Sequence, residues 1–421
     1  MDTQTRVISN SSLRFLYEAG NPITIKAGFR TVSMQTISSY SSDETIDVPD
    51  ILNSVESLQF CGMSTETSNM LFQKWTLDQE TLVPGNLGHG EEIISLAKYY
   101  VKQMSRKYNA YLENDDWNYA LRKQGISETT IGRIMDPKFQ YLRLSSSASE
   151  WALDTLSLSW EFLDGLDARV KRSKKELVMR STSPDPSLIP MPAIKPSSSL
   201  SSALHGGSSS LLLASEAEPP KQMPGKSMFY KGGGWDRLIS IFNPDGSLNL
   251  SEIVSDPPTD FHPFFFNLYF TKQYDVAEHY AEYAGRRVPA QTPTIMTVAV
   301  PQAIMAQSRE IFGADWRNLI WHSRNKTVLV EAGGRLPSQL SEYEEAQVLI
   351  GNICYQGTDQ IKRLKSSDEL LVLRTKRGDK GSQIMLHGME MLDLFKKECR
   401  GLVWVAPVAT PEKAKFFPSA P

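Results

Sequence analysis

Hydrophobic side chains recur at steps of three and four residues through much of residues 49–175. This spacing puts them on one face of a helix and predicts amphipathic helices. The pattern is strongest in two segments, with apolar positions at Ile94, Ala97, Val101, Met104, Tyr108 and Leu112, and at Trp151, Leu153, Leu156, Trp160, Leu163, Leu166 and Val170. Residues 49–60 and 126–134 predict two shorter helices. We expect a helical domain over 49–175, a bundle of about four to six helices.

The chain on either side of this region is polar. Residues 1–48 carry Ser and Thr clusters with strand-like pieces at 15–17 and 23–25, which predict a partly ordered arm. Residues 176–225 alternate serine runs with prolines such as Pro190 and Pro220. Such a composition buries too little apolar surface to offset the entropy of ordering it. It predicts a disordered linker that separates two domains.

Residues 226–421 change to short apolar runs separated by turns such as Asn243-Pro-Asp-Gly246. The runs predict strands at residues 228–230, 264–270, 294–300, 318–322, 327–331, 346–353, 360–364, 370–373 and 402–406, with helices at 235–242, 276–284, 301–312 and 393–397. Many short strands with few helices indicate an α+β domain. Thr271 lies between a predicted strand and helix, where its hydroxyl is placed to cap the helix.

Composition limits the classes of function. A chain of 421 residues with 40% hydrophobic and 22% charged residues is typical of a globular protein of about two or three domains. The net charge of -3 gives no nucleic-acid or membrane signal. The three cysteines, Cys61, Cys354 and Cys399, fit no disulfide framework or zinc site. We therefore expect no metal. With no signal peptide and no apolar run of roughly 20 residues, we expect a cytoplasmic or nuclear protein.

Two motif classes are excluded, and one acidic pair has an ordinary interpretation. No G-x-G-x-x-G follows a predicted strand and no G-x-x-x-x-G-K-[ST] occurs, which excludes Rossmann and P-loop sites. Asp115 and Asp116 have the chemistry of Mg²⁺ ligands or of an acid–base pair. Because no second acidic motif accompanies them, a solvated junction between helices is favoured.

The segment around Thr271 resembles a signature of the ADP-ribosyltransferase family. Leu268-Tyr-Phe-Thr271 followed by Val276-Ala-Glu-His-Tyr280 is similar to the motif in which a strand ends in a tyrosine and a helix follows. Asp260 and His262, in Thr-Asp-Phe-His-Pro, resemble the turn that precedes this motif in some microbial and fungal relatives. The resemblance covers the C-terminal half only. It implies a split antiparallel sheet and NAD⁺ as substrate, with Tyr269 stacking on nicotinamide and Thr271 in the cofactor site.

Two further motifs of the family have counterparts in the same order. Phe229-Tyr-Lys-Gly232 resembles the first, which implies that Tyr230, Lys231 and Gly232 bind the cofactor. Tyr343-Glu-Glu-Ala-Gln-Val-Leu-Ile350 resembles the third, which implies that Glu345 or Gln347 stabilises the charge that develops on the ribose. Both motifs depart from the family. Lys231 stands where the family has His or Arg, and the order E-x-Q replaces E-x-E or Q-x-E.

These departures leave three functions open. The first is ADP-ribosyl transfer or NAD⁺ hydrolysis catalysed by Tyr269, Glu345 and Gln347, with a protein acceptor or partner bound through the helical domain. The second is a catalytically inactive relative that binds a nucleotide or a protein. The third is an enzyme that uses the same pocket for another small molecule. Each residue also has an ordinary interpretation, with Lys231 in a glycine turn, Tyr269 in a core or edge strand, and Glu345 in a charged loop.

Overall fold

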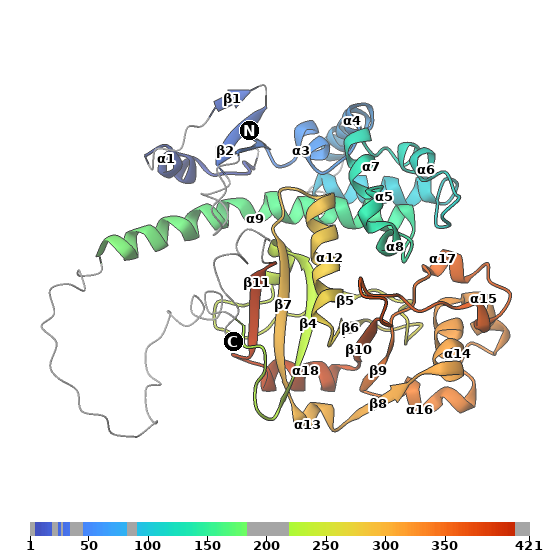
Figure 1. The fold of residues 1–421 in the computed structure, drawn as a ribbon. Helices are drawn as coiled ribbons and strands as arrows, with labels where there is room; N and C mark the ends of the chain where they lie inside the picture. Colours follow the sequence, from blue (N-terminus) through green and yellow to red (C-terminus); the bar gives the residue numbers. More distant parts are fainter. Residues whose placement is uncertain are drawn as a thin grey trace, which may run out of the picture.

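The protein has an α+β fold in which an N-terminal helical half packs on a C-terminal half of strands and helices (Figure 1). The structure, a computed structural model, describes residues 5–18, 24–26, 28–33, 45–81, 91–182 and 219–408. Most of the predicted linker, at 183–218, therefore lies outside the described residues.

The N-terminal half is built around one long helix. Its elements are α1 (Asn10–Glu18), β1 (Thr24–Lys26), β2 (Phe29–Ser33), β3 (Thr45–Pro49), α3 (Val55–Phe60), α4 (Thr65–Thr81), α5 (Ile93–Ser105), α6 (Trp117–Lys123), α7 (Glu128–Ile134), η1 (Pro137–Phe139), α8 (Gln140–Arg143) and α9 (Ala148–Thr182). The apolar stripe of α9, including Trp160 and Leu163, is buried in a core shared with α3, α5 and α6. The periodicity thus predicted α5, α7 and α9, whereas α4 was not predicted and residues 49–60 are helical only from Val55.

Two further features of the N-terminal half differ from the prediction. The arm contains a three-stranded sheet in the order β1-β2-β3, and residues 15–17 belong to α1. Helix α9 continues to Thr182, into the segment predicted as linker. Asp115 and Asp116 have the structural role favoured by the sequence, at a junction between helices. Asp116 caps α6 by accepting the Tyr119 N–H at 2.9 Å, and Asp115 accepts the N–H groups of Tyr111 and Leu112.

The C-terminal half contains two sheets. Its elements are β4 (Lys226–Gly234), α11 (Trp235–Ile239), β5 (Val254–Ser255), β6 (Asn267–Phe270), α12 (Tyr274–Arg287), β7 (Pro293–Pro301), α13 (Gln302–Met305), β8 (Ser308–Ile311), α14 (Gly313–Arg324), α15 (Lys326–Glu331), η3 (Ser338–Leu340), α16 (Ser341–Glu344), β9 (Val348–Asn352), α17 (Thr358–Ile361), η4 (Ser367–Glu369), β10 (Ser382–Leu386), α18 (Met389–Glu398) and β11 (Val403–Pro407). One sheet has the strand order β5-β6-β10-β9-β8 and the other β11-β7-β4.

The two sheets meet at one backbone pair. The N–H of Tyr230 donates to the carbonyl of Thr271 at 2.7 Å, and the N–H of Thr271 donates back at 2.9 Å. Between the sheets lies an apolar core that includes Phe229, Phe270 and Val298. Helix α12 packs against β4 and β7 (Figure 1).

Several predicted elements of this half are wrong. Residues 318–322 lie in α14, which buries Trp316, Leu319, Ile320 and Ser323 at a helical spacing. Residues 327–331 lie in α15, which the Asn325 side chain caps by accepting the Val328 N–H. The predicted helix 301–312 divides into α13 and β8, and β8 pairs in parallel with β9. Residues 360–364 overlap α17, and 370–373 form only an isolated bridge through Val372. Strand β10, between β6 and β9, was not predicted.

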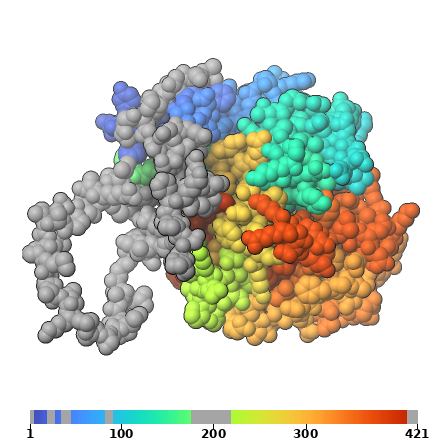
Figure 2. Space-filling view, viewed as in Figure 1, coloured from blue at the N-terminus to red at the C-terminus, as the bar shows by residue number. Residues whose placement is uncertain are grey.

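The two halves pack closely through apolar and charged contacts. Tyr283 of α12 is buried in the core of the helical half, where its ring lies edge-on to Trp151 at 5.0 Å. Asp154 of α9 forms ion pairs with Arg237 at 2.7 Å and Arg287 at 2.6 Å. Figure 2 shows residues of the first half, in blue to cyan-green, lying directly against those of the second half. The described parts of the two halves therefore form one body.

Candidate functional site

A cavity of about 420 Å³ lies where β4, β6 and α12 meet the helical half. Its volume falls within the range of small-molecule sites. The walls come from both halves of the chain, because Ser145 and Ser146 lie just before α9 whereas most of the remaining lining belongs to the two sheets and α12. Five of the seven predicted site residues line it, namely Tyr230, Lys231, Gly232, Tyr269 and Thr271.

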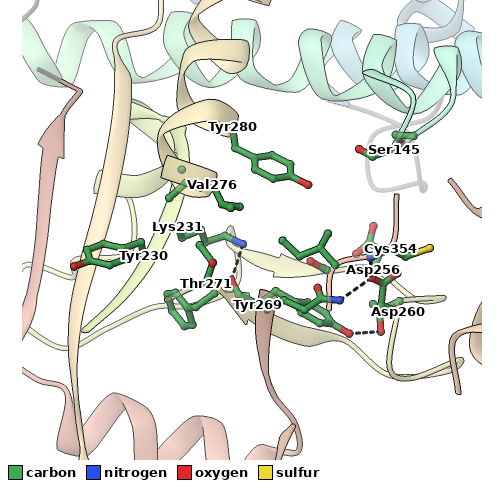
Figure 3. A pocket seen from close by; sticks show the side chains of 18 of the residues that line it. Ser145, Tyr230, Lys231, Asp256, Asp260, Tyr269, Thr271, Val276, Tyr280 and Cys354 are labelled. Atoms are coloured by element: carbon green, nitrogen blue, oxygen red, sulfur yellow. Dashed lines mark hydrogen bonds between the residues drawn. The ribbon is translucent and has the colours of Figure 1, made fainter. Parts of the chain in front are cut away.

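Lys231 places an amine in this cavity. Its Nζ donates to the carbonyl oxygen of Tyr269 at 3.3 Å, as Figure 3 shows. Among the described residues no carboxylate forms an ion pair with it. Burial lowers the pKa of Lys231 to about 8, and the positive charge of Arg237 adds to the effect. Lys231 belongs to β4 and not to a glycine turn, so its backbone is fixed by pairing with Met296 of β7.

Tyr269 is held rigidly in the wall. Its hydroxyl donates to Thr259 Oγ1 at 2.9 Å and accepts the N–H of Phe261 at 3.2 Å. Burial raises the pKa of Tyr269, and the nearby carboxylate of Asp260 acts in the same direction. The phenol is therefore neutral and its ring is fixed in position, as a stacking residue needs to be.

Asp260 and Arg324 form a charged brace beside Tyr269. Arg324 donates to Asp260 Oδ1 at 2.7 Å. The other carboxylate oxygen accepts the N–H of Cys354 at 3.1 Å and the side-chain amide of Gln383 at 2.7 Å. Because these contacts occupy both carboxylate oxygens, Asp260 stabilises the wall and is poorly placed to act as a free base.

Tyr280 and Asp256 add polar groups that the sequence pattern had not singled out for the site. Tyr280 extends from α12 into the cavity, and burial raises its pKa to about 12 (Figure 3). Its hydroxyl therefore stays protonated at neutral pH and remains a hydrogen-bond donor. Asp256 lies in the loop between β5 and β6 and is exposed at the cavity. Nothing in the local sequence distinguishes either residue from ordinary helix or loop positions.

Gly232 has a packing role as well as a place in the lining. A Cβ atom at this position would lie 1.8 Å from the carbonyl oxygen of Ala277 in α12. Only glycine lets the helix approach the strand this closely. The Tyr230 ring packs edge-on to Tyr274 at 5.4 Å, and Figure 3 shows it pointing away from the Lys231 amine.

Thr271 acts mainly through its backbone. Its hydroxyl accepts the N–H of Gln273 at 3.0 Å, but the residue in the N-cap position of α12 is Gln273. The predicted cap at Thr271 is therefore displaced by two residues. Phe264, Phe265 and Phe266, predicted as strand, precede β6 and are more than half exposed.

The structure does not bring Glu345 and Gln347 to the cavity. Both precede β9, whereas residues 353 and 354, after the other end of that strand, line the site. A strand of 5 residues spans about 16 Å at about 3.3 Å per residue. Glu345 is exposed, and the carbonyl of Gln347 accepts the N–H of His387 at 2.9 Å. The expected grouping of these two residues with Tyr269 is thus not formed.

The histidines contribute little to this cavity. His262 is buried and stacks on His387 with ring centroids 4.7 Å apart. His279 stacks on Phe139 at 5.2 Å and does not line the cavity. Within the described ranges, no group of three or more His, Cys, Asp or Glu side chains is placed to hold a metal ion.

Comparisons with known proteins gave no match. No protein-family model matches the chain, and neither a search of curated proteins nor one of solved structures found a similar protein. Among the helices in the described part of the chain, none is both long and apolar enough to cross a membrane.

Proposed function

We propose that the cavity binds NAD⁺ or a closely related nucleotide, as an ADP-ribosyltransferase-like site without rapid turnover. The observation that carries the proposal is the Lys231 amine, which lies beside Tyr269 at 3.3 Å from its carbonyl oxygen and has no carboxylate partner among the described residues. A cation without a counter-ion favours an anionic ligand. The neighbouring Tyr269 ring offers a surface on which a planar base or nicotinamide stacks.

The split sheet supports the same proposal. The resemblance implied a split antiparallel sheet in which the strand that ends near Tyr269 is followed by a helix. Strand β4 and the end of β6 are joined through Tyr230 and Thr271, and α12 follows. This arrangement is compatible with the family but does not by itself identify it, because one fold hosts many functions.

Binding is favoured over turnover because the expected catalytic pair is remote. Breaking the nicotinamide–ribose bond creates positive charge on the ribose, which a positioned carboxylate stabilises. Glu345 and Gln347 lie beyond the opposite end of β9, and Asp260 is engaged by Arg324. Asp256 is the remaining carboxylate in the lining, and it is exposed. The nucleotide-binding alternative therefore fits the geometry better than efficient transfer.

Calorimetric titration of the full chain with NAD⁺, together with a nicotinamide-release assay, tests the proposal. Lys231→Met removes the charge and is expected to weaken binding by roughly tenfold or more, since a hydrogen bond to a charged group contributes about 1.5–3 kcal/mol. The matched control is Lys326→Met at an exposed position in α15. Absence of NAD⁺ binding by the unmodified chain would overturn the proposal, and rapid nicotinamide release would favour the transferase alternative.

A further inference from the structure

Lys231 has a second chemical property that nucleotide binding does not use. A lysine reacts with carbonyl compounds only through its neutral amine. With a pKa of about 8, roughly a tenth of the Lys231 amines are neutral at pH 7, whereas an ordinary lysine with a pKa near 10.4 is neutral in only about 0.04% of molecules. The cause is structural, since Lys231 is half-buried in the cavity wall and its Nζ donates to the uncharged carbonyl of Tyr269.

We propose that Lys231 is a reactive amine that forms a Schiff base with an aldehyde- or ketone-bearing small molecule in the cavity. The Nζ lone pair attacks the carbonyl carbon, and a proton moves from nitrogen to the carbonyl oxygen to give a carbinolamine. Loss of this hydroxyl as water then leaves the C=N bond. The step needs no oxidant, reductant or metal.

The surroundings of Lys231 suit this reaction. The Tyr280 hydroxyl shares the cavity and stays protonated, so it is a donor for the carbonyl oxygen. Asp256, also in the lining, supplies a carboxylate that is able to pass a proton during loss of water. The rigid strand β4 holds the amine in place through its pairing with β7.

Two lysines of the described residues differ from Lys231 because each forms an ion pair with a carboxylate. Lys376 pairs with Glu282 at 3.0 Å, and Lys171 pairs with Asp167 at 2.6 Å. Lys326 is exposed to solvent. Lys231 should therefore react first, although reagents reach the surface lysines more easily.

The test is reductive trapping in the folded full chain. The protein is mixed with substoichiometric glycolaldehyde and cyanoborohydride at pH 7, and peptide mass spectrometry measures the adduct at each lysine over time. We expect the adduct at Lys231 to form at least about tenfold faster than that at Lys326 in the same sample. The rate at Lys231 should level off above a pH near 8.

Equal or slower labelling of Lys231 would overturn the inference, and no variant has to fold for that comparison. The test also separates this inference from nucleotide binding. Trapping at Lys231 in a chain that does not bind NAD⁺ would support the Schiff base and count against the proposed function. Binding of NAD⁺ without preferential trapping at Lys231 would support the proposed function and overturn the Schiff base. Protection of Lys231 by NAD⁺ would support both.

Discussion

Tyr230 and Thr271 exchange two backbone hydrogen bonds, at 2.7 and 2.9 Å, across the junction of the two sheets. Because Lys231 follows Tyr230 and Tyr269 lies two residues before Thr271, this pair sets the Lys231 amine against the Tyr269 carbonyl. The cavity exists because the sheets meet here and α12 starts directly after the junction. Changes that move the junction should therefore affect stability and binding together.

Gly232→Ala tests the close approach of α12 to β4. The new Cβ would lie 1.8 Å from the carbonyl oxygen of Ala277, so the helix or strand has to move. We expect a loss of about 3 kcal/mol in the free energy of unfolding, measured by urea denaturation. The control is Gly132→Ala in α7, where nothing lies within 4 Å of the new Cβ. This control should gain about 0.5–1 kcal/mol through helix propensity. Equal behaviour of the two variants would contradict the packing role of Gly232.

Asp154→Asn tests the charged contact between the halves. Asp154 pairs with Arg237 and with Arg287, and the Arg287 side chain is only 3% exposed. Loss of the carboxylate leaves the buried Arg287 guanidinium without its ion-pair partner, whereas Arg237 keeps its pair with Glu161 at 2.7 Å. We expect a destabilisation of about 3 kcal/mol, measured by denaturant unfolding of the full chain.

The matched control for Asp154 is an exposed ion pair. Arg122 and Glu128 pair at 2.5 Å with side chains that are 54% and 67% exposed. Solvent screens such pairs, so Glu128→Gln should change the unfolding midpoint little. A loss as large as that of Asp154→Asn would show that burial is not the reason for the difference.

Asp236→Asn should have an effect that depends on pH. Burial raises the pKa of Asp236 from 3.8 to about 6, and Arg169 at 3.4 Å opposes this only in part. A raised pKa means that the folded protein binds the proton more tightly than the unfolded chain. The associated stability is present below pH 3.8 and is lost as pH rises through 6.

The asparagine variant lacks this titration. Its stability relative to the unmodified protein should therefore increase between pH 4 and pH 7, by up to about 3 kcal/mol for a pKa raised from 3.8 to about 6. Denaturant unfolding of both proteins at the two pH values gives the difference directly. A stability gap that is the same at both pH values would show that Asp236 has an ordinary pKa in the folded state.

Replacing Glu345 and Gln347 together should leave nucleotide binding unchanged. Both residues lie beyond the end of β9 opposite the cavity. The double variant Glu345→Gln, Gln347→Ala is expected to keep the Kd for NAD⁺ within about twofold, in contrast to Tyr269→Ala, which removes the ring from the wall. A calorimetric titration of both variants checks this. Loss of binding or of nicotinamide release in the double variant would place these residues in the working site.

The local pattern of hydrophobic positions was sufficient to predict the elements in which buried positions recur over many residues. The apolar stripe of Trp151, Trp160 and Val170 predicted α9, and the four-residue spacing of Val276, Tyr280 and Ala284 predicted α12. Long amphipathic helices are determined mainly by their own sequence, because each turn buries the same face. The resemblance to the ADP-ribosyltransferase motifs singled out Lys231, Tyr269 and Thr271, and all three line one cavity.

Only the tertiary structure decided the short elements and the rest of the site. Apolar runs of about five residues fit a strand or a buried helix equally well, and 318–322 became helical because α14 buries Trp316 and Ile320. Strand β8 forms because β9 offers a parallel partner. The cavity joins Ser145, Lys231, Tyr280 and Arg324 from distant segments. The sequence determines which side chains are apolar and are stabilised by burial. Which of them come into contact depends on how the sheets and helices pack. That packing placed Tyr280 in the cavity and Glu345 outside it.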